Sequence, residues 1–208
     1  MCKAEFYTTV EHEGYAEFEE KKSVFISHAL PVKSEEEAAA FVKKIKNEYR
    51  DARHNVFAYV LGSTVQKYSD DGEPQGSAGM PVLDVIRKNG CTDTAVVVTR
   101  YFGGILLGVG GLVRAYSHSA KLALDAAHII TYEKYSLMRL SCSYSDYGKY
   151  SAELARFGVT DAEPVFSEDV TLNFSVKSAR EAELDKFVTE LSFGKAIAEK
   201  TGEKFDYK

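Results

Sequence analysis

The stretch with the clearest chemical potential is 99–116, which carries five glycines in nine positions. These glycines are Gly103, Gly104, Gly108, Gly110 and Gly111. An apolar run, 95–98, precedes them and a helical pattern follows, so we expect a strand, a glycine loop and a helix. Backbone N–H groups in such a loop and at a helix N-terminus can hold an anion. Arg100 or Arg114 would then close on that anion.

The spacing of these glycines also allows a purely structural interpretation. It matches neither Gly-x-x-x-x-Gly-Lys-Ser/Thr nor Gly-x-Gly-x-x-Gly, the two common nucleotide-binding patterns. Glycines equally permit a helix to pack closely on a strand. The sequence therefore allows two interpretations of this loop: it binds an anion, or it lets the helix pack closely on the strand.

A second candidate is the loop 69–81, where Asp70, Asp71 and Glu73 place three carboxylates within four positions. Carboxylate oxygens suit Mg²⁺, and paired carboxylates can serve acid–base chemistry. The loop lacks the alternating ligands of a calcium-binding hand, and Asp, Gly and Pro are typical turn residues. We therefore predict a turn with no metal, and no cofactor elsewhere in the chain.

A third candidate is His54, which follows Arg53 and directly precedes a predicted strand. Its imidazole would serve as a general base or as a phosphate contact. The competing interpretation is a histidine held by structural hydrogen bonds. The sequence contains neither a Gly-x-Ser-x-Gly elbow nor a His-Glu-x-x-His motif. We assign no catalytic residue, and the pattern favours a protein that is not an enzyme.

The elements that must position these residues follow from periodicity and turn signals. Ser34 and Glu37 form a capping box at the start of an amphipathic pattern, which predicts a helix. Glu17, Glu19 and Glu20 indicate a solvated face or a turn. In chain order we predict strands 6–10 and 23–30, a helix 35–50, a strand 55–61, a helix 82–88, a strand 94–99 and a helix 112–127.

The remaining residues predict the order β-α-β-β-α-β of a ferredoxin-like fold. Asp146 and Ser178 are the expected N-caps of its helices, and a short linker is expected at 128–134. The fold class is therefore α+β, with domains at 1–134 and 135–208. The predicted elements are a strand 136–144, a helix 146–157, strands 161–166 and 170–176, a helix 179–191 and a strand from 195 to 201 or beyond.

Composition and charge narrow the class of protein. The chain has 208 residues, of which 45% are hydrophobic and 27% charged, as in ordinary soluble proteins. It has no membrane-length apolar run, and its start lacks the apolar core of a signal peptide. Three scattered cysteines indicate reduced thiols, so we expect a cytoplasmic protein. The net charge of −5 argues against general affinity for nucleic acids, but it does not exclude a local basic patch on the surface.

Five motifs, in their order and spacing, resemble those of the YigZ/Impact family. They are Lys22-Ser23-Val24-Phe25-Ile26, Arg53-His54-Asn55 with Ala58-Tyr59, Ser69-Asp70-Asp71-Gly72-Glu73-Pro74, Val97-Val98-Thr99-Arg100-Tyr101-Phe102-Gly103-Gly104 and Gly110-Gly111-Leu112-Val113-Arg114-Ala115-Tyr116. The resemblance covers about residues 20–130 strongly. Leu106 departs from it, because family members often have a lysine there.

The resemblance implies a fold and a cellular setting. The N-terminal domain would be like the second domain of a ribosomal small-subunit protein, with a left-handed β-α-β crossover. The C-terminal domain would be ferredoxin-like, similar to a module of translation elongation factor G. The eukaryotic Impact relative regulates translation through protein–protein contact, whereas the bacterial members are biochemically uncharacterised.

Three functional hypotheses follow. The first is a non-catalytic, translation-associated regulator that binds RNA, the ribosome or a protein partner. We rank this hypothesis and the third together above the second. The second is a phosphate-ligand enzyme or sensor, in which the 70–73 carboxylates hold Mg²⁺ and Arg100 and Arg114 clamp phosphate. The third is a partner-binding module that uses the acidic loop and nearby aromatic residues. Neither a membrane role nor an oligomeric state is predicted.

Overall fold

The computed structural model describes residues 5–207 and divides them into two compact units. The N-terminal unit comprises Tyr7–Thr131, and the C-terminal unit comprises residues 5–6 and 132–207. The element order along the chain is mixed α and β, which confirms the predicted α+β class. Residues 129–134, predicted as part of a linker, instead belong to strand β7 (Ile129–Cys142).

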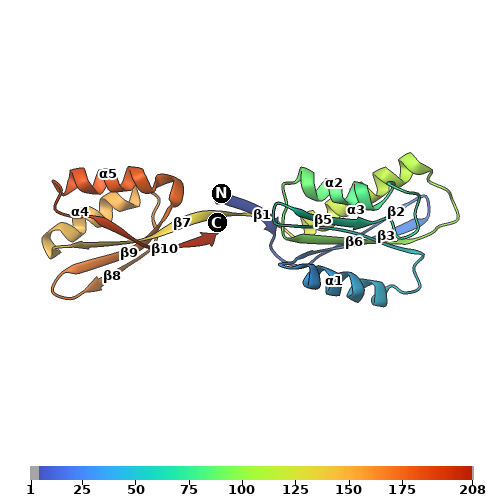
Figure 1. Cartoon of the computed structure of the whole chain (residues 1–208), viewed down its shortest axis with the longest axis horizontal. Coiled ribbons are helices and arrows are strands. Elements are labelled where there is room, and N and C mark those ends of the chain that lie inside the picture. Colours follow the sequence, from blue (N-terminus) through green and yellow to red (C-terminus); the bar gives the residue numbers. More distant parts are fainter. Residues whose placement is uncertain (1–4, 208) are drawn as a thin grey trace. The chain divides into compact units, whose positions relative to one another are not determined.

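The N-terminal unit is built on a sheet that lies between helices (Figure 1). The sheet has five strands in the order β2-β3-β6-β4-β5. Each neighbouring pair is antiparallel. Strands β3 and β4 both run antiparallel to β6, so they are parallel to each other, and α1 (Glu35–Glu48) connects them. The strands are β2 (Gly14–Glu20), β3 (Ser23–Pro31), β4 (His54–Leu61), β5 (Val65–Ser69) and β6 (Thr94–Tyr101).

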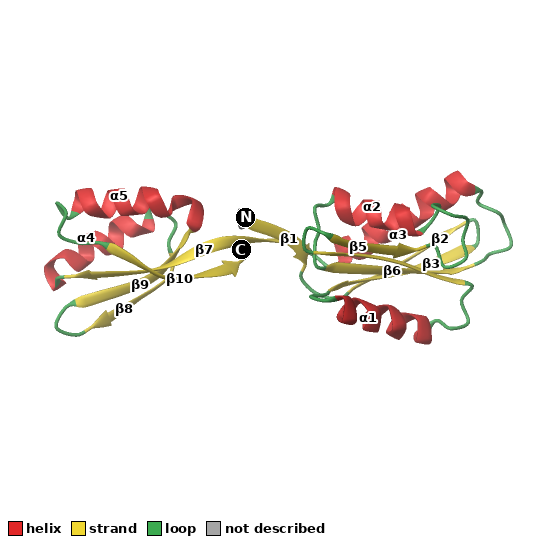
Figure 2. Cartoon of the chain, viewed as in Figure 1, coloured by secondary structure: helices red, strands yellow, loops and turns green. Residues whose placement is uncertain are grey.

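Helices cover both faces of this sheet (Figure 2). Helix α1 lies on one face, and α2 (Gly79–Lys88) and α3 (Val109–Ala126) lie on the other. The central strand β6 shows why: Val96 and Val98 pack in the core under α2 and α3, while Ala95 and Val97 pack in the core under α1. Because successive side chains of a strand point to opposite faces, an unbroken apolar run satisfies both layers.

The C-terminal unit has the predicted β-α-β-β-α-β order. Its strands lie side by side in the order β10-β7-β9-β8, and β1 (Phe6–Val10) also belongs to this sheet. Helices α4 and α5 cover one face, where Leu140, Leu154 and Leu184 are buried in a common core (Figure 1). Of the helices that the structure describes, none is long and apolar enough to cross a membrane. The elements after β7 are α4 (Tyr144–Ala155), β8 (Thr160–Phe166), β9 (Val170–Lys177), α5 (Glu181–Leu191) and β10 (Ala198–Asp206).

Two strands were not predicted, β2 and β5. The carboxylates of Glu17, Glu19 and Glu20 do form a solvated face, but they do so on edge strand β2 rather than in a turn. The turn lies one step later, at Lys21 and Lys22, both with positive φ. Charged side chains are common on edge strands because they discourage pairing with another chain. Because these residues are charged, β-propensity alone did not predict the strand.

Helix starts depended on partners that are distant in sequence. The Ser34 cap is confirmed, since its side chain accepts a hydrogen bond from the Glu37 N–H. The cap of α4 is Ser143 rather than Asp146. Ser178 caps no α-helix, because it begins a 3₁₀ turn and its hydroxyl pairs with Ser136. Helix α2 begins three residues before the predicted start, at Gly79, because Asp70 accepts a hydrogen bond from the Gly79 N–H.

The cysteines of the described chain are unpaired. Cys91 and Cys142 are both buried free thiols, and Cys2 lies outside the described residues. Burial raises the pKa of the Cys91 thiol to about 11, which keeps it protonated and unreactive near neutral pH.

Candidate functional site

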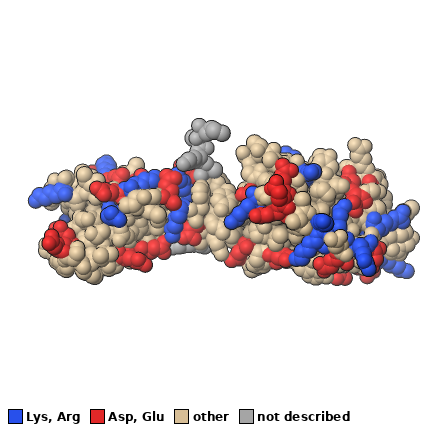
Figure 3. Space-filling view, turned by 60° about the horizontal axis from the view of Figure 1, so that its bottom comes forward, with Lys and Arg blue, Asp and Glu red and all other residues tan. Residues whose placement is uncertain are grey.

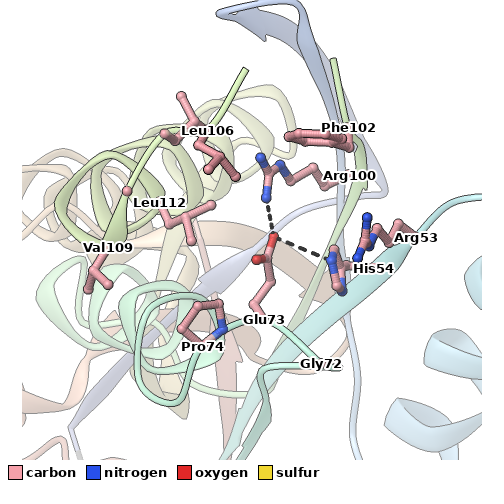
Figure 4. A pocket seen from close by; sticks show the side chains of 12 residues that line it. Arg53, His54, Gly72, Glu73, Pro74, Arg100, Phe102, Leu106, Val109 and Leu112 are labelled. Atoms are coloured by element: carbon pink, nitrogen blue, oxygen red, sulfur yellow. Dashed lines mark hydrogen bonds and ion pairs between the residues drawn. The ribbon is translucent and has the colours of Figure 1, made fainter. Parts of the chain in front are cut away.

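A pocket of about 420 Å³ opens in the N-terminal unit, where three segments distant in sequence meet (Figure 4). These segments are the start of β4, the acidic loop, and the end of β6 with the glycine loop. In the register of β4 with β6, His54 lies opposite Arg100. We call this cavity the Glu73 pocket. It is lined by Arg53, His54, Gly72, Glu73, Pro74, Arg100, Phe102, Leu106, Leu107, Gly108, Val109 and Leu112.

Glu73 is the centre of the polar part of the pocket. One carboxylate oxygen, Oε1, accepts hydrogen bonds from Arg100 Nη1 at 2.6 Å and from the Tyr116 hydroxyl at 2.8 Å. The side chains of Glu73 and Arg100 are only 5% and 6% exposed. Burial, and secondarily the Glu73 carboxylate, raises the pKa of Tyr116, so its hydroxyl stays a donor. Glu73 thereby joins the acidic loop to both β6 and α3.

The Arg100 guanidinium is held by two aromatic rings and by hydrogen bonds from Nη1 and Nη2, whereas its buried Nε has no hydrogen-bond partner among the described residues. It lies between the rings of Phe25 and Phe102, with centroid distances of 5.5 and 5.6 Å, which favours a cation. Its Nη2 donates to Ser23 Oγ at 3.3 Å, and the same oxygen accepts the Gly103 N–H. Arg100 therefore fixes the shape of the site, because its Nη1 and Nη2 groups donate to protein atoms.

His54 presents one ring nitrogen to the pocket. A carbonyl oxygen can only accept, so the 2.8 Å contact between His54 Nδ1 and the Asp71 carbonyl fixes a proton on Nδ1. In the neutral ring, Nε2 carries the lone pair and lies 3.9 Å from Glu73 Oε1, a contact that is an ion pair when the ring is protonated (Figure 4). Among the described residues, neither His54 Nε2 nor Glu73 Oε2 receives a hydrogen bond. The base of the pocket therefore favours a ligand that supplies a hydrogen-bond donor.

The two other loop carboxylates serve the fold of the loop. Asp70 accepts hydrogen bonds from the N–H groups of Gly76, Ala78 and Gly79. Asp71 pairs with Lys46 Nζ at 2.6 Å and accepts the Asn55 N–H. Asp70, Asp71 and Glu73 thus bind different parts of the protein, and among the described residues they form no cluster with metal-ligand spacing.

The glycines of this loop have different roles, because one allows close packing and another lines the pocket. At Gly103 a Cβ atom would lie 2.0 Å from the Lys22 carbonyl group, so only glycine allows this close approach. Gly108, with φ of 69°, precedes α3 and lines the pocket, whereas Gly104, Gly110 and Gly111 do not line it. Arg114 lies on α3 and borders a different hollow, beside Lys21 and His118. Arg100 and Arg114 therefore line different cavities, which gives little support to the hypothesis that they clamp one phosphate.

The rim of the pocket is apolar and exposed. Leu106 has 82% of its surface exposed, in a loop where it covers no core. Arg53 is an exposed cation on the same wall. The exposed apolar residues of this loop and the start of α3 are Phe102, Ile105, Leu106, Val109 and Val113.

Sequence reasoning missed two contributors to the site. Tyr116 was named as part of a family motif; it is buried in the core of the N-terminal unit, and its hydroxyl also binds Glu73. Leu106 was considered only as a missing positive charge. The sequence did contain a signal that could have predicted the apolar rim. Apolar side chains inside a glycine-rich loop have no core to pack against, so they are expected to be exposed.

Comparisons with known proteins locate this pocket in a recognised domain. The sequence profile of the Impact N-terminal domain matches residues 21–124, which include every residue lining the Glu73 pocket. A second profile, a domain of unknown function (DUF1949), matches residues 140–195.

Relatives match over most of their length. The Bacillus subtilis protein "IMPACT family member YvyE" is 40% identical over 192 residues, covering 91% of this chain and 88% of the relative. The Escherichia coli "IMPACT family member YigZ" is 35% identical, covering 84% and 87%. A crystal structure of a hypothetical protein, 31% identical, superposes with a TM-score of 0.61 over 96% of this chain and 99% of that one.

Proposed function

The chain belongs to the Impact family, and from that premise we propose that it is a non-catalytic, translation-associated regulator that binds a protein partner in the cytoplasm. The translation role rests on the resemblance to the eukaryotic Impact relative, which is an analogy between family members. The nature of the partner rests on the site itself. Of the partner classes that the sequence suggests, namely RNA, the ribosome and a protein, the Glu73 pocket favours a protein surface.

The observation that carries this proposal is the apolar rim around a polar base. Exposed, contiguous apolar side chains are typical of protein interaction sites. An apolar anchor from the partner would pack against Leu106 and Val109 and direct a donor group to His54 Nε2. The partner we propose therefore presents an apolar side chain next to an N–H or O–H donor.

The charge distribution gives RNA less support. Single-stranded RNA is bound by basic grooves with stacked aromatic rings. The two cations that line the pocket are Arg53 and Arg100, and Arg100 is paired with Glu73. On the face drawn in Figure 3, basic and acidic side chains are interspersed rather than gathered into one basic patch.

The geometry also gives little support to the phosphate-ligand alternative. Two donor groups of Arg100 are engaged with Glu73 and Ser23, and Arg114 borders a separate hollow. A phosphate entering the pocket would meet the buried Glu73 carboxylate. A thermal-shift titration with nucleotides and Mg²⁺ tests the alternative, and we expect no shift.

A site-specific cross-linker tests the proposal directly. Benzoylphenylalanine in place of Leu106 is irradiated in cells, and the adducts are identified by mass spectrometry. We expect a protein adduct from the translation machinery, which is lost when Val109→Asp places a charge on the rim. The matched control carries the cross-linker at Val165, an exposed apolar residue of the C-terminal unit. Adducts made only with RNA, or a protein adduct unaffected by Val109→Asp, would show that the proposal is wrong.

A further inference from the structure

A cluster of two imidazoles and a carboxylate lies in the N-terminal unit outside the Glu73 pocket. We propose that Glu11, His12 and His128 bind a divalent transition-metal ion of the Zn²⁺ class. One ligand atom from each of the three side chains lies within 4.8 Å of the others. Among the described residues this is the group with metal-ligand spacing, and the Glu73 pocket contributes nothing to it.

The backbone holds the three residues together before any metal binds. Glu11 and His12 lie in the turn between β1 and β2, and His128 follows α3. The Glu11 N–H donates to the carbonyl groups of Ala127 and His128, at 3.0 and 2.8 Å, and the His12 N–H donates to Ala127 at 3.2 Å. The ligand-bearing segments are therefore fixed by main-chain contacts, which lowers the entropy cost of assembling a site.

A glycine permits this close approach. A Cβ atom at Gly14 would lie 2.4 Å from the Ala123 carbonyl oxygen and 2.4 Å from the Ala127 nitrogen. The turn that carries Glu11 and His12 can therefore rest directly on the last turn of α3. The consequence is that a metal ion would join two segments that are already in contact, rather than pull together two mobile ones.

The spacing of the ligand atoms suits a tetrahedral ion. His128 Nδ1 and Glu11 Oε2 are 3.5 Å apart. Two ligands at about 2.0–2.2 Å from Zn²⁺ in tetrahedral geometry are separated by about 3.3–3.6 Å. The rings of His12 and His128 have centroids 4.9 Å apart and are tilted by 52°, and one nitrogen of each ring lies within 4.8 Å of the other two ligand atoms.

His12 also has the outer contact that orients metal-binding histidines. Its Nδ1 lies 3.0 Å from the Glu13 carbonyl oxygen and must donate to it. The lone pair of the neutral ring is then on Nε2, as in histidines whose second nitrogen is fixed by a carbonyl group. Glu13 itself is engaged with Lys44 and is not needed as a ligand.

The donor set selects the class of metal. Two imidazole nitrogens and one carboxylate oxygen form a ligand set known for Zn²⁺, with a remaining position for water or for a group from another molecule. Nitrogen ligands disfavour Mg²⁺ and Ca²⁺, which prefer oxygen alone. Because all three residues are exposed, the remaining position is open to solvent.

Calorimetric titration of the untagged full-length protein with Zn²⁺ tests the proposal. We expect one site, and we expect His128→Ala to weaken Zn²⁺ binding at least about tenfold, because loss of even an outer partner of a metal ligand costs about 10–100-fold in affinity. Zn²⁺ should also raise the melting temperature of the wild type but not of His128→Ala. Co²⁺ should give the visible absorption of a four- or five-coordinate ion, which His12→Ala abolishes.

The matched control is His118→Ala, which removes an exposed histidine of α3 that meets the Phe18 ring edge to face and lies outside the cluster. This variant should bind Zn²⁺ like the wild type. Equal Zn²⁺ binding by His118→Ala and His128→Ala, or no saturable binding by the wild type, would overturn the proposal. All of these positions are exposed, but His128 has a positive φ, so the circular dichroism of each variant is compared with that of the wild type to show that the fold is retained.

Discussion

The two units of the protein differ in the burial of their ion pairs. The N-terminal unit buries its central ion pair, Arg100–Glu73, almost completely. The C-terminal unit places its ion pairs at the surface, for example Lys204 with Asp161. The difference follows from the layers: helices cover both faces of the N-terminal sheet, whereas α4 and α5 lie on one face of the other sheet.

This contrast shows which charges can define a binding site. A buried pair needs good geometry and further hydrogen bonds to offset its desolvation, so its atoms are held in place. Arg100 and Glu73 have those extra contacts, from Ser23 and Tyr116. Exposed pairs are screened by water and salt and hold little in position. The Glu73 pocket is therefore found in the unit that contains a buried ion pair.

The largest effect should come from breaking the buried pair. Glu73→Ala leaves the Arg100 cation buried without its partner and should cost the N-terminal unit about 3–5 kcal/mol. Urea unfolding followed by hydrogen exchange of the β6 amides measures this loss. The double variant Glu73→Ala/Arg100→Leu should recover a large part of it. An unchanged stability of Glu73→Ala would show that the pair is not essential to this unit.

Substitution of two glycines should change stability by a smaller amount, and with opposite signs in the two units. Gly103→Ala forces a Cβ atom against the Lys22 backbone and should destabilise the N-terminal unit by about 1–3 kcal/mol. Gly148→Ala lies inside α4 with nothing within 4 Å, so it should stabilise the C-terminal unit by about 0.5–1 kcal/mol. Calorimetric unfolding of both variants checks the opposite signs. The same sign for both would contradict the packing argument.

Removal of an exposed ion pair should lower stability by a still smaller amount. Lys204→Ala removes contacts to Asp161 and Asp206, and the side chain of Lys204 is one-third exposed. We expect a loss below about 1 kcal/mol, measured as the urea midpoint of the C-terminal unit. Lys204→Met, which keeps the aliphatic stem without the charge, separates packing from electrostatics. A loss as large as that of Glu73→Ala would remove the distinction between the two units.

The smallest effect should appear in acid. Lys134 and Lys200 lower the pKa of the Glu203 carboxyl from 4.5 to about 2. The stabilisation from its ionised form is therefore present above about pH 4.5 and is lost as the pH falls through about 2. Because the group is exposed, 1 M NaCl should reduce this part of the acid sensitivity. Glu203→Gln should show a shallower loss, and an identical pH profile for Glu203→Gln would refute the assignment.

Predictability from sequence varied with the range of the interaction involved. The capping box at Ser34 and the apolar run of β6 depend on neighbouring residues, and both were predicted. The start of α2 was not, because it depends on Asp70, nine residues before Gly79. His54, Glu73 and Arg100 were all named as candidates, but as separate motifs. Only the register of β4 with β6 placed His54 opposite Arg100.

The sequence by itself determined most of the elements other than β2 and β5, the order β-α-β-β-α-β and the family. Periodicity, turn chemistry and φ angles are local, so they can be read from neighbouring residues. Tertiary structure decided which charges pair and which stay exposed. Arg100 and Arg114 are alike in sequence, but one lies buried at the end of a central strand and the other lies on the exposed side of α3. Their different roles arise because electrostatic pairing depends on distance and burial, which non-local packing alone sets.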